Sequence, residues 1–201
     1  MTSQGKKFIV VGGGIGGLAA AVALSQQGCH VTVLEQAAEL GEIGAGVQLA
    51  PNAFAALDAL GVGENARKRA VFTEQLIMMD AVDGSEVGSF PVGQAFRDRF
   101  KNPYAVIHRA DIHATILEGA QGSDLIQVET STKVASVTQD DAGVTAVDQN
   151  GRVFKADALI AADGVRSVIR EKMFNDPPRI SGHVVYRAVV PVEEMPADLQ
   201  I

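Results

Sequence analysis

Residues 8–35 read FIVVGGGIGGLAAAVALSQQGCHVTVLE, and their pattern gives the clearest structural signal in the chain. The apolar run 8–11 is typical of a strand that is buried on both faces of a parallel sheet. A glycine-rich turn follows it, and then an Ala- and Leu-rich segment, 18–27, predicts a helix that ends at Gly28. The run 30–34 predicts a second strand. Two such strands joined by a helix form a β-α-β unit with a right-handed crossover.

The glycines between the first strand and the helix match the pattern Gly-x-Gly-x-x-Gly. Gly12 allows a tight turn, Gly14 lets the backbone approach a pyrophosphate, and Gly17 lets the helix pack closely on the strand. The start of the helix, with Ile15 and Gly16, presents unpaired N–H groups and a partial positive charge to phosphates. The pattern therefore predicts a dinucleotide site.

Glu35 ends the second predicted strand, 23 residues after Gly12. A carboxylate at this place accepts hydrogen bonds from ribose hydroxyls and disfavours a 2′-phosphate, so the sequence predicts FAD or NAD rather than NADP. The alternative interpretation is a glycine-rich turn that binds nothing, with Glu35 as a solvated strand end. The strand, the glycines, the helix and Glu35 follow one another in the order and spacing of a dinucleotide-binding unit, which favours dinucleotide binding over the alternative.

The rest of the chain places antiparallel strands between the nucleotide-binding segments. We therefore predict an α/β fold, a Rossmann-like domain with an inserted antiparallel-sheet substrate domain. The predicted nucleotide-binding parts are 1–73 and 103–178, and the predicted substrate-domain parts are the hairpin 74–102 and the sheet start 179–201. Up to residue 101, the predicted elements are a loop over 39–47, a helix over 51–60, two strands within 75–90 joined at Asp83-Gly84, and a polar turn over 97–101. They are followed by a strand over 104–108, a helix over 111–118 capped by Asp111, and three short strands within 125–154. The last predicted elements are a strand over 156–162, a helix over 167–174 and a strand over 181–192.

Composition narrows the function classes. The 201 residues carry 17 Lys plus Arg against 24 Asp plus Glu, a net charge of −7. An acidic chain without a basic run is a poor partner for nucleic acid or an anionic membrane. The uncharged run 8–34 contains glycines and polar residues, which make a poor membrane span. Cys29 is the single cysteine and cannot form an internal disulfide or a zinc site, so we expect no metal and a cytoplasmic location.

A second motif separates FAD from NAD. Residues 161–170 read AADGVRSVIR, a predicted strand end, an acidic turn and a basic helix start. This segment resembles the Asp-Gly motif of the FAD-dependent aromatic hydroxylases, which are single-component flavoprotein monooxygenases. The matching residues are Asp163, Gly164, Ser167 and Arg170, together with Arg109, which matches the arginine that precedes a helix in that family.

The resemblance covers residues 8–201 and points to the salicylate hydroxylase and 3-hydroxybenzoate 6-hydroxylase branch. It is carried by GAGVQLAPN at 44–52, NPYAVIHR at 102–109 and SGHVVYR at 181–187. The resemblance implies FAD as cofactor and assigns its contacts. These are Gly46 and Val47 beside the isoalloxazine ring, Arg109 at the flavin, the backbone of Val134 at the adenine, and Asp163 and Gly164 near the pyrophosphate.

The resemblance also implies a reaction. NADH would reduce FAD, the reduced flavin would capture O₂ as a C4a-hydroperoxide, and a small aromatic acid (3-hydroxybenzoate or salicylate) would be hydroxylated. Period-two alternation in the strand over 181–192 puts His183 and Arg187 on one face, where they could meet the phenol and the carboxylate of a hydroxybenzoate. The alternative is an exposed polar sheet face. Tyr104 is a candidate for the pocket wall, or a core residue.

The third flavin motif of the family, a Gly-Asp segment, does not occur in the 201 residues. The last predicted strand also lacks a visible partner, so the sequence predicts the N-terminal portion of a longer enzyme, truncated at the C-terminus. Two other functions stay open. One is another FAD oxidoreductase of the same fold, such as an amine oxidase or an epoxidase, and the other is an inactive fragment that only binds nucleotide. A homodimer is compatible with the sequence.

Overall fold

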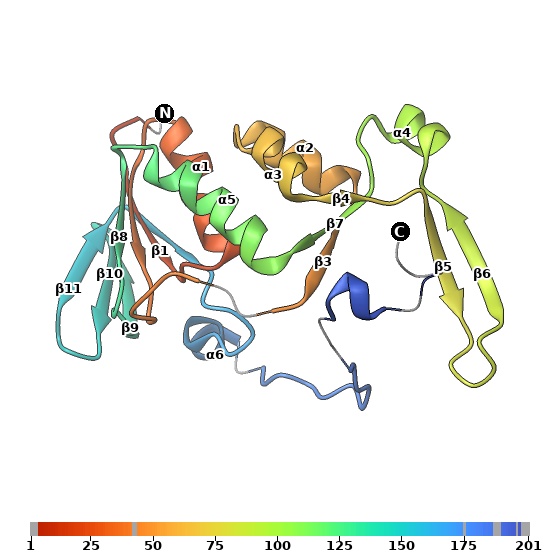
Figure 1. Cartoon of the computed structure of the whole chain (residues 1–201). Coiled ribbons are helices and arrows are strands. Elements are labelled where there is room, and N and C mark those ends of the chain that lie inside the picture. Colours follow the sequence, from red (N-terminus) through yellow and green to blue (C-terminus); the bar gives the residue numbers. More distant parts are fainter. Residues whose placement is uncertain (1–3, 42–43, 175, 187–189, 196, 198–201) are drawn as a thin grey trace.

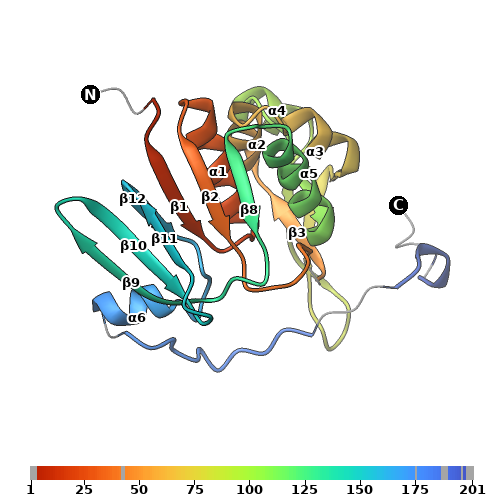
Figure 2. The ribbon, with the colours of Figure 1, turned by 90° about the vertical axis from the view of Figure 1, so that its left-hand side faces the viewer.

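The computed structural model describes residues 4–41, 44–174, 176–186, 190–195 and 197. Its centre is a parallel sheet with the strand order β12-β1-β2-β8. These strands are β1 (Lys7–Val11), β2 (His30–Leu34), β8 (Ile126–Glu129) and β12 (Ala158–Ala161). Helix α1 (Ile15–Gln26) joins β1 to the parallel β2, so the predicted β-α-β unit is confirmed. Figures 1 and 2 show the sheet between a layer of helices and a second sheet.

The apolar sequence of β1 follows from its place in the middle of these layers. Ile9 and Val11 pack with Val134 and Ala146 of the second sheet, and Val10 packs on the other face with Ala21 of α1. A strand that is covered on both faces needs apolar side chains at every position rather than at every second one.

The helical layer consists of α1, α2 (Pro51–Ala59), α3 (Gly63–Arg69) and α5 (Arg109–Gln121). Its buried core joins Leu18 of α1, Phe54 of α2 and Ile116 of α5. Pro51 stands in the first turn of α2, where the missing N–H costs nothing. This packing brings α5 against α1 and places the start of α5 near the start of α1.

The second layer is an antiparallel sheet with the order β11-β10-β9. Its strands are β9 (Val134–Asp140), β10 (Gly143–Asp148) and β11 (Val153–Ala156), and α6 (Val168–Phe174) packs beside it. The predicted number of strands within 125–154 was three, but four strands begin in this range, namely β8, β9, β10 and β11. Of these four strands, β8 does not belong to the antiparallel sheet, because it pairs with β2 in the parallel sheet.

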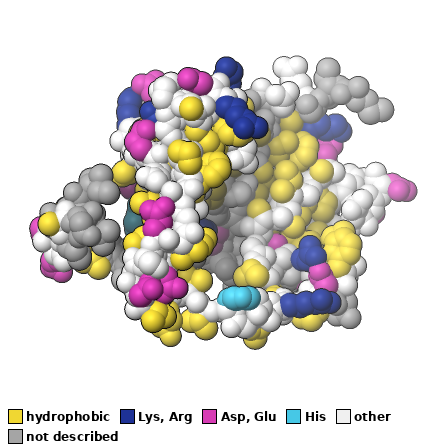
Figure 3. Space-filling view, turned by 90° about the vertical axis from the view of Figure 1, so that its right-hand side faces the viewer, with side chains coloured by type: hydrophobic (Ala, Val, Ile, Leu, Met, Phe, Trp, Pro, Cys, Tyr) yellow, Lys and Arg dark blue, Asp and Glu magenta, His cyan; other side chains and the backbone are white. Residues whose placement is uncertain are grey.

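The inserted hairpin is confirmed at the predicted turn. Strands β5 (Gln75–Met79) and β6 (Glu86–Pro91) pair antiparallel around Asp83-Gly84, and Gly84 has a positive φ of 73°. The hairpin projects away from the parallel sheet (Figure 1). Figure 3 views the molecule from the side of the hairpin and shows apolar side chains gathered on this side of the molecule. The exposed apolar side chains of the hairpin include Ile77, Met78, Val87 and Phe90.

Several short elements were missed in the sequence. The predicted loop over 39–47 runs into β3 (Gly46–Leu49), which pairs with β7 (Ala105–His108), and β7 also pairs with β4 (Val71–Phe72). The predicted polar turn over 97–101 is largely α4 (Gln94–Phe100). Helices of two turns show too little periodicity to be recognised and depend on tertiary contacts. For α4 these include the ion pair between Arg97 and Glu74.

The predicted strand over 181–192 is wrong for the part that the structure describes. Residues 181–186 and 190–191 form no strand, and a short 3₁₀ helix, Val192–Glu194, ends the segment. A lone extended segment leaves its N–H and C=O groups unpaired, so alternation alone does not make a strand without a neighbour.

Within the described ranges, none of the helices combines the length and the apolar character that crossing a bilayer requires.

Candidate functional site

A groove of about 730 Å³ lies at the carboxyl ends of β1, β2 and β12, next to the start of α1. Ligands of open α/β sheets bind at this edge. The groove brings together most of the predicted cofactor residues from five separate parts of the chain. They are Gly12, Gly14, Ile15, Gly16, Glu35, Arg109, Val134, Asp163 and Gly164.

Two positions at and beneath the groove require glycine. Gly12 has a φ of +107°, and a Cβ there would lie less than 3.0 Å from the carbonyl oxygen of Ala162. Gly17 is buried under the groove, and a Cβ there would collide with the carbonyl oxygen of Gly12. The structure thus confirms the expected tight turn at Gly12 and the close contact of helix and strand at Gly17. The amides at the start of α1 face a space that side chains do not fill.

Glu35 lies at the end of β2 and its carboxylate is fixed by two backbone amides. Gly13 N–H donates to Oε2 at 2.6 Å, and Ala37 N–H donates to Oε1 at 2.8 Å. Each carboxylate oxygen has a second lone pair, and Glu35 lines the groove. A ribose hydroxyl can therefore donate to Glu35 while both backbone bonds persist.

We expect Glu35→Gln to weaken FAD binding by about tenfold, ~1.4 kcal/mol. Glutamine offers one oxygen instead of two, so either Gly13 N–H or Ala37 N–H would face the amide nitrogen. Flavin fluorescence titration measures the dissociation constant. Glu39→Gln is the matched control, because Glu39 is an exposed glutamate in the same loop. Equal affinities of the wild type and Glu35→Gln would show that the carboxylate does not contact the ligand.

The segment that follows β8 is joined to Glu35 through the backbone. Glu35 N–H donates to the carbonyl of Glu129 at 2.9 Å, and Thr132 N–H donates to the carbonyl of Glu35 at 2.8 Å. Thr132, Lys133 and Val134 line the same groove. These bonds tie this edge of the groove to Glu35. The edge includes the Val134 backbone, which the family resemblance predicts at the adenine.

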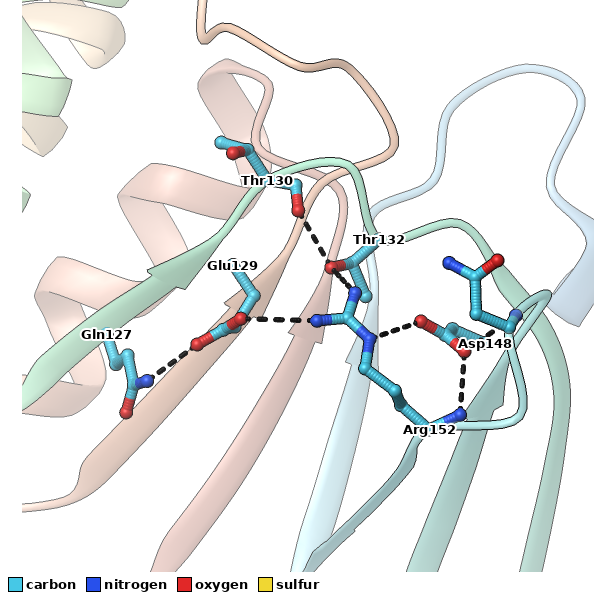
Figure 4. A network of polar contacts seen from close by, with 7 residues as sticks. Gln127, Glu129, Thr130, Thr132, Asp148 and Arg152 are labelled. Atoms are coloured by element: carbon cyan, nitrogen blue, oxygen red, sulfur yellow. Dashed lines mark hydrogen bonds and ion pairs between the residues drawn. The ribbon is translucent and has the colours of Figure 1, made fainter.

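A polar network holds this edge from below (Figure 4). Arg152 donates from Nη2 to the Thr132 hydroxyl at 2.5 Å and from Nε to Asp148 Oδ2 at 2.7 Å, and its Nη1 lies 3.6 Å from Glu129 Oε2. Gln127 donates to the other oxygen of Glu129 at 2.6 Å. The network links β8, the start of β9 and the turn between β10 and β11. Sequence reasoning missed it, because nothing local signals a contact between residues twenty positions apart.

Asp148 is the buried anion of this network, with a side chain that is 0% exposed. Burial acts to raise the pKa of this carboxyl, but the hydrogen bonds from the Arg152 side chain and from the amides of Arg152 and Asn150 outweigh it. The pKa of Asp148 is therefore lowered from its ordinary value, and this carboxylate stays ionised at neutral pH.

Asp163 follows β12 and caps α6. Its Oδ2 accepts from Val168 N–H at 3.0 Å, and the Ser167 hydroxyl accepts from Arg170 N–H at 3.0 Å. Among the described residues, no group bonds to the buried Oδ1 of Asp163, and Asp163 is one of the residues that line the groove. A buried carboxylate oxygen without a partner costs about 1–3 kcal/mol, so a donor on a bound ligand fits this position. Arg170, the last residue of the Asp-Gly motif match, pairs with Asp176.

Arg109 is the first residue of α5 and lines the groove. The cap of α5 is His108, whose Nδ1 accepts from Ala110 N–H at 3.3 Å, so the predicted cap at Asp111 was wrong. The Arg109 amide donates to the carbonyl of Ala45 at 3.3 Å, which ties the approach to β3 to this end of the groove.

Gly46 and Val47 lie on β3, paired with His108 and Ile107 of β7, and do not line the groove themselves. Their contact with an isoalloxazine ring stays a prediction.

The predicted catalytic residues are not brought together in the described structure. Tyr104 is half-buried just before β7, and His183 is exposed in the segment without strand structure. Arg187 lies outside the described residues. The alternation that placed His183 and Arg187 on one face therefore has no strand to support it, and their roles stay predictions.

Comparison with known proteins identifies the family of the chain. Residues 6–196 match the FAD binding domain family. The chain belongs to this family. Over 192 residues it is 58% identical to the 3-hydroxybenzoate 6-hydroxylase of Polaromonas naphthalenivorans, covering 96% of this chain and 48% of that protein. Over 195 residues it is 56% identical to the 3-hydroxybenzoate 6-hydroxylase of Klebsiella oxytoca, covering 97% and 49%. The chain spans about half the length of the curated relatives it matches.

A solved structure supports the same assignment. A variant of HpxO from Klebsiella pneumoniae, complexed with FAD, matches 87% of this FAD-binding domain and 44% of its own chain. Its TM-score is 0.72 at 30% identity. The predicted fold class and the predicted resemblance are both confirmed. FAD is the cofactor of this family, and the glycine-lined helix start, Glu35 and the unpartnered oxygen of Asp163 fit its phosphates and hydroxyl groups.

Proposed function

We propose that this FAD-binding domain belongs to an NADH-using monooxygenase that hydroxylates 3-hydroxybenzoate. The observation that carries the proposal is the similarity to two 3-hydroxybenzoate 6-hydroxylases at 58% and 56% identity over nearly the whole chain. Salicylate is the second candidate substrate, because the sequence resembles the salicylate hydroxylases as well.

Residues of this chain would hold and orient the cofactor. The amides at the start of α1 would bind the diphosphate, Glu35 would accept from a ribose hydroxyl, and Asp163 Oδ1 would accept from a further donor of the ligand. When bound, FAD supplies the redox and oxygen chemistry that no side chain provides. Arg109 puts a fixed positive charge at the same groove, where it would offset the charge of the diphosphate.

The proposal predicts that the purified full-length protein oxidises NADH at least tenfold faster when 3-hydroxybenzoate is present. One NADH and one O₂ would be consumed for each dihydroxybenzoate and water formed. Spectrophotometry at the nicotinamide band, an oxygen electrode and chromatography of the product measure the three quantities. A product with the new hydroxyl para to the first would match the reaction in the relatives' names.

Controls separate this proposal from the alternatives. Salicylate replaces 3-hydroxybenzoate in a parallel assay, and a primary amine tests for an amine oxidase. Oxidation of an amine without any hydroxylation of phenols would overturn the hydroxylase. Binding of FAD without either activity would favour a protein that only binds nucleotide.

His183→Ala tests the predicted contact of His183 with the phenol, and unchanged turnover would remove His183 from the catalytic residues. A homodimer and a cytoplasmic location stay predictions.

A further inference from the structure

His113 is a buried polar residue that lies outside the glycine motif and has no role in the proposed function. It lies on α5, is 3% exposed, and its Nε2 is 2.8 Å from the carbonyl oxygen of Gly13. A carbonyl only accepts, so Nε2 carries the proton of this bond. The contact links a helix one hundred residues away in the sequence to the middle of the glycine-rich turn.

Gly13 is held from both sides. Its N–H donates to Glu35 Oε2 at 2.6 Å, while its carbonyl accepts from His113. Both residues of the Gly13-Gly14 peptide are glycines, which have the widest backbone freedom and restrict rotation of the peptide plane least. The side chains of Glu35 and His113 therefore supply the restraint that the turn itself lacks.

The direction of the Gly13 carbonyl determines the direction of the next amide. In a planar trans peptide the C=O and the N–H point in opposite directions, and the described chain has no cis peptide. Because the Gly13 carbonyl points to α5, the Gly14 N–H points away from α5. Gly14 caps α1 and lines the groove, so its amide is not needed within the helix.

We propose that His113 is a positioning residue of the dinucleotide site, which fixes the Gly13-Gly14 peptide so that the Gly14 amide faces the diphosphate of the ligand. Without this bond the peptide can rotate and present its carbonyl dipole to the phosphates. The proposal rests on the FAD-binding part of the proposed function and is independent of hydroxylation.

The test is calorimetric titration of ADP into the flavin-depleted full chain. His113→Met removes the donor, and we expect ADP to bind about tenfold more weakly. His113→Gln places an amide N–H near the position of Nε2 and should restore the affinity to within about threefold of the wild type. If His113→Met does not fold, His113→Asn replaces it, because its shorter amide cannot reach Gly13. The ³¹P chemical shift of bound ADP should match the wild type only in His113→Gln.

Thr115→Val is the matched control. Thr115 lies two residues further along α5, is 0% exposed, and its hydroxyl bonds to the Asp111 carbonyl and to Arg69 rather than to the glycine turn. We expect it to lower the melting temperature without changing ADP affinity by more than about twofold. Wild-type affinity in His113→Met, or an equal loss in Thr115→Val, would overturn the role of His113. Failure of the wild type to bind either ADP or FAD would overturn the FAD-binding function itself.

Discussion

Replacing Gly17 by alanine is expected to destabilise the protein by about 3 kcal/mol and to weaken FAD binding by about 100-fold. The added Cβ would lie less than 3.0 Å from the carbonyl oxygen of Gly12, which belongs to the backbone and has no rotamer to change. The start of α1 must therefore move away from β1. Since the same helix start forms the floor of the groove, the damage to folding and to binding has one cause. Urea unfolding and flavin fluorescence titration measure the two effects.

Gly16→Ala is the matched control for stability. Gly16 lies one residue earlier in the same helical turn, is exposed, and a Cβ there would meet no atom within 4 Å. Alanine is the better helix former, so the free energy of unfolding should stay the same or rise by up to about 1 kcal/mol. A comparable loss of stability in both variants would show that the collision at Gly17 is not the cause.

The sequence predicts this part of the fold well because its signals are local. A glycine at a positive φ, an apolar run covered on both faces and a carboxylate at a strand end are each visible within a few residues. The β-α-β unit, the hairpin at Asp83-Gly84, and the glycine turn and Glu35 of the groove were found in this way. The remaining groove residues that were predicted came from the family resemblance. The elements β3 and α4 were missed because their stability comes from partners distant in the sequence.

The supports of the groove were missed for the same physical reason. His113 and Arg152 act on the glycine turn and on Thr132 from other elements, and neither belongs to a motif. The opposite error occurred at 181–192, where alternation predicted a strand that finds no neighbour in the described structure. A pattern of side chains predicts which face would be buried, but hydrogen bonding to a second strand decides whether a strand forms.

Breaking the polar network that holds the 132–134 edge of the groove is the second large effect that we expect. Arg152→Leu should lower the melting temperature by on the order of 8 °C, because it removes the main partner of a carboxylate that is 0% exposed. FAD affinity should fall with it, since Thr132 and the backbone of Glu35 move together. Lys68→Ala is the control, because Lys68 and Glu64 form an exposed pair and its loss should cost less than about 2 °C.

The pH dependence of this difference identifies its electrostatic origin. The folded-state pKa of Asp148 lies below its unfolded value, so the stabilisation is fully present above the unfolded pKa and is lost as the pH falls through the folded pKa. The gap in melting temperature between the wild type and Arg152→Leu should therefore be largest near neutral pH and narrow as the pH falls into the acid range, where Asp148 becomes protonated in both proteins. The other acids with lowered pKa values are shared by both proteins and cancel in the difference. A gap that stays constant into the acid range would assign the effect of Arg152 to packing of its side chain, for which Phe154 is the nearest aromatic partner.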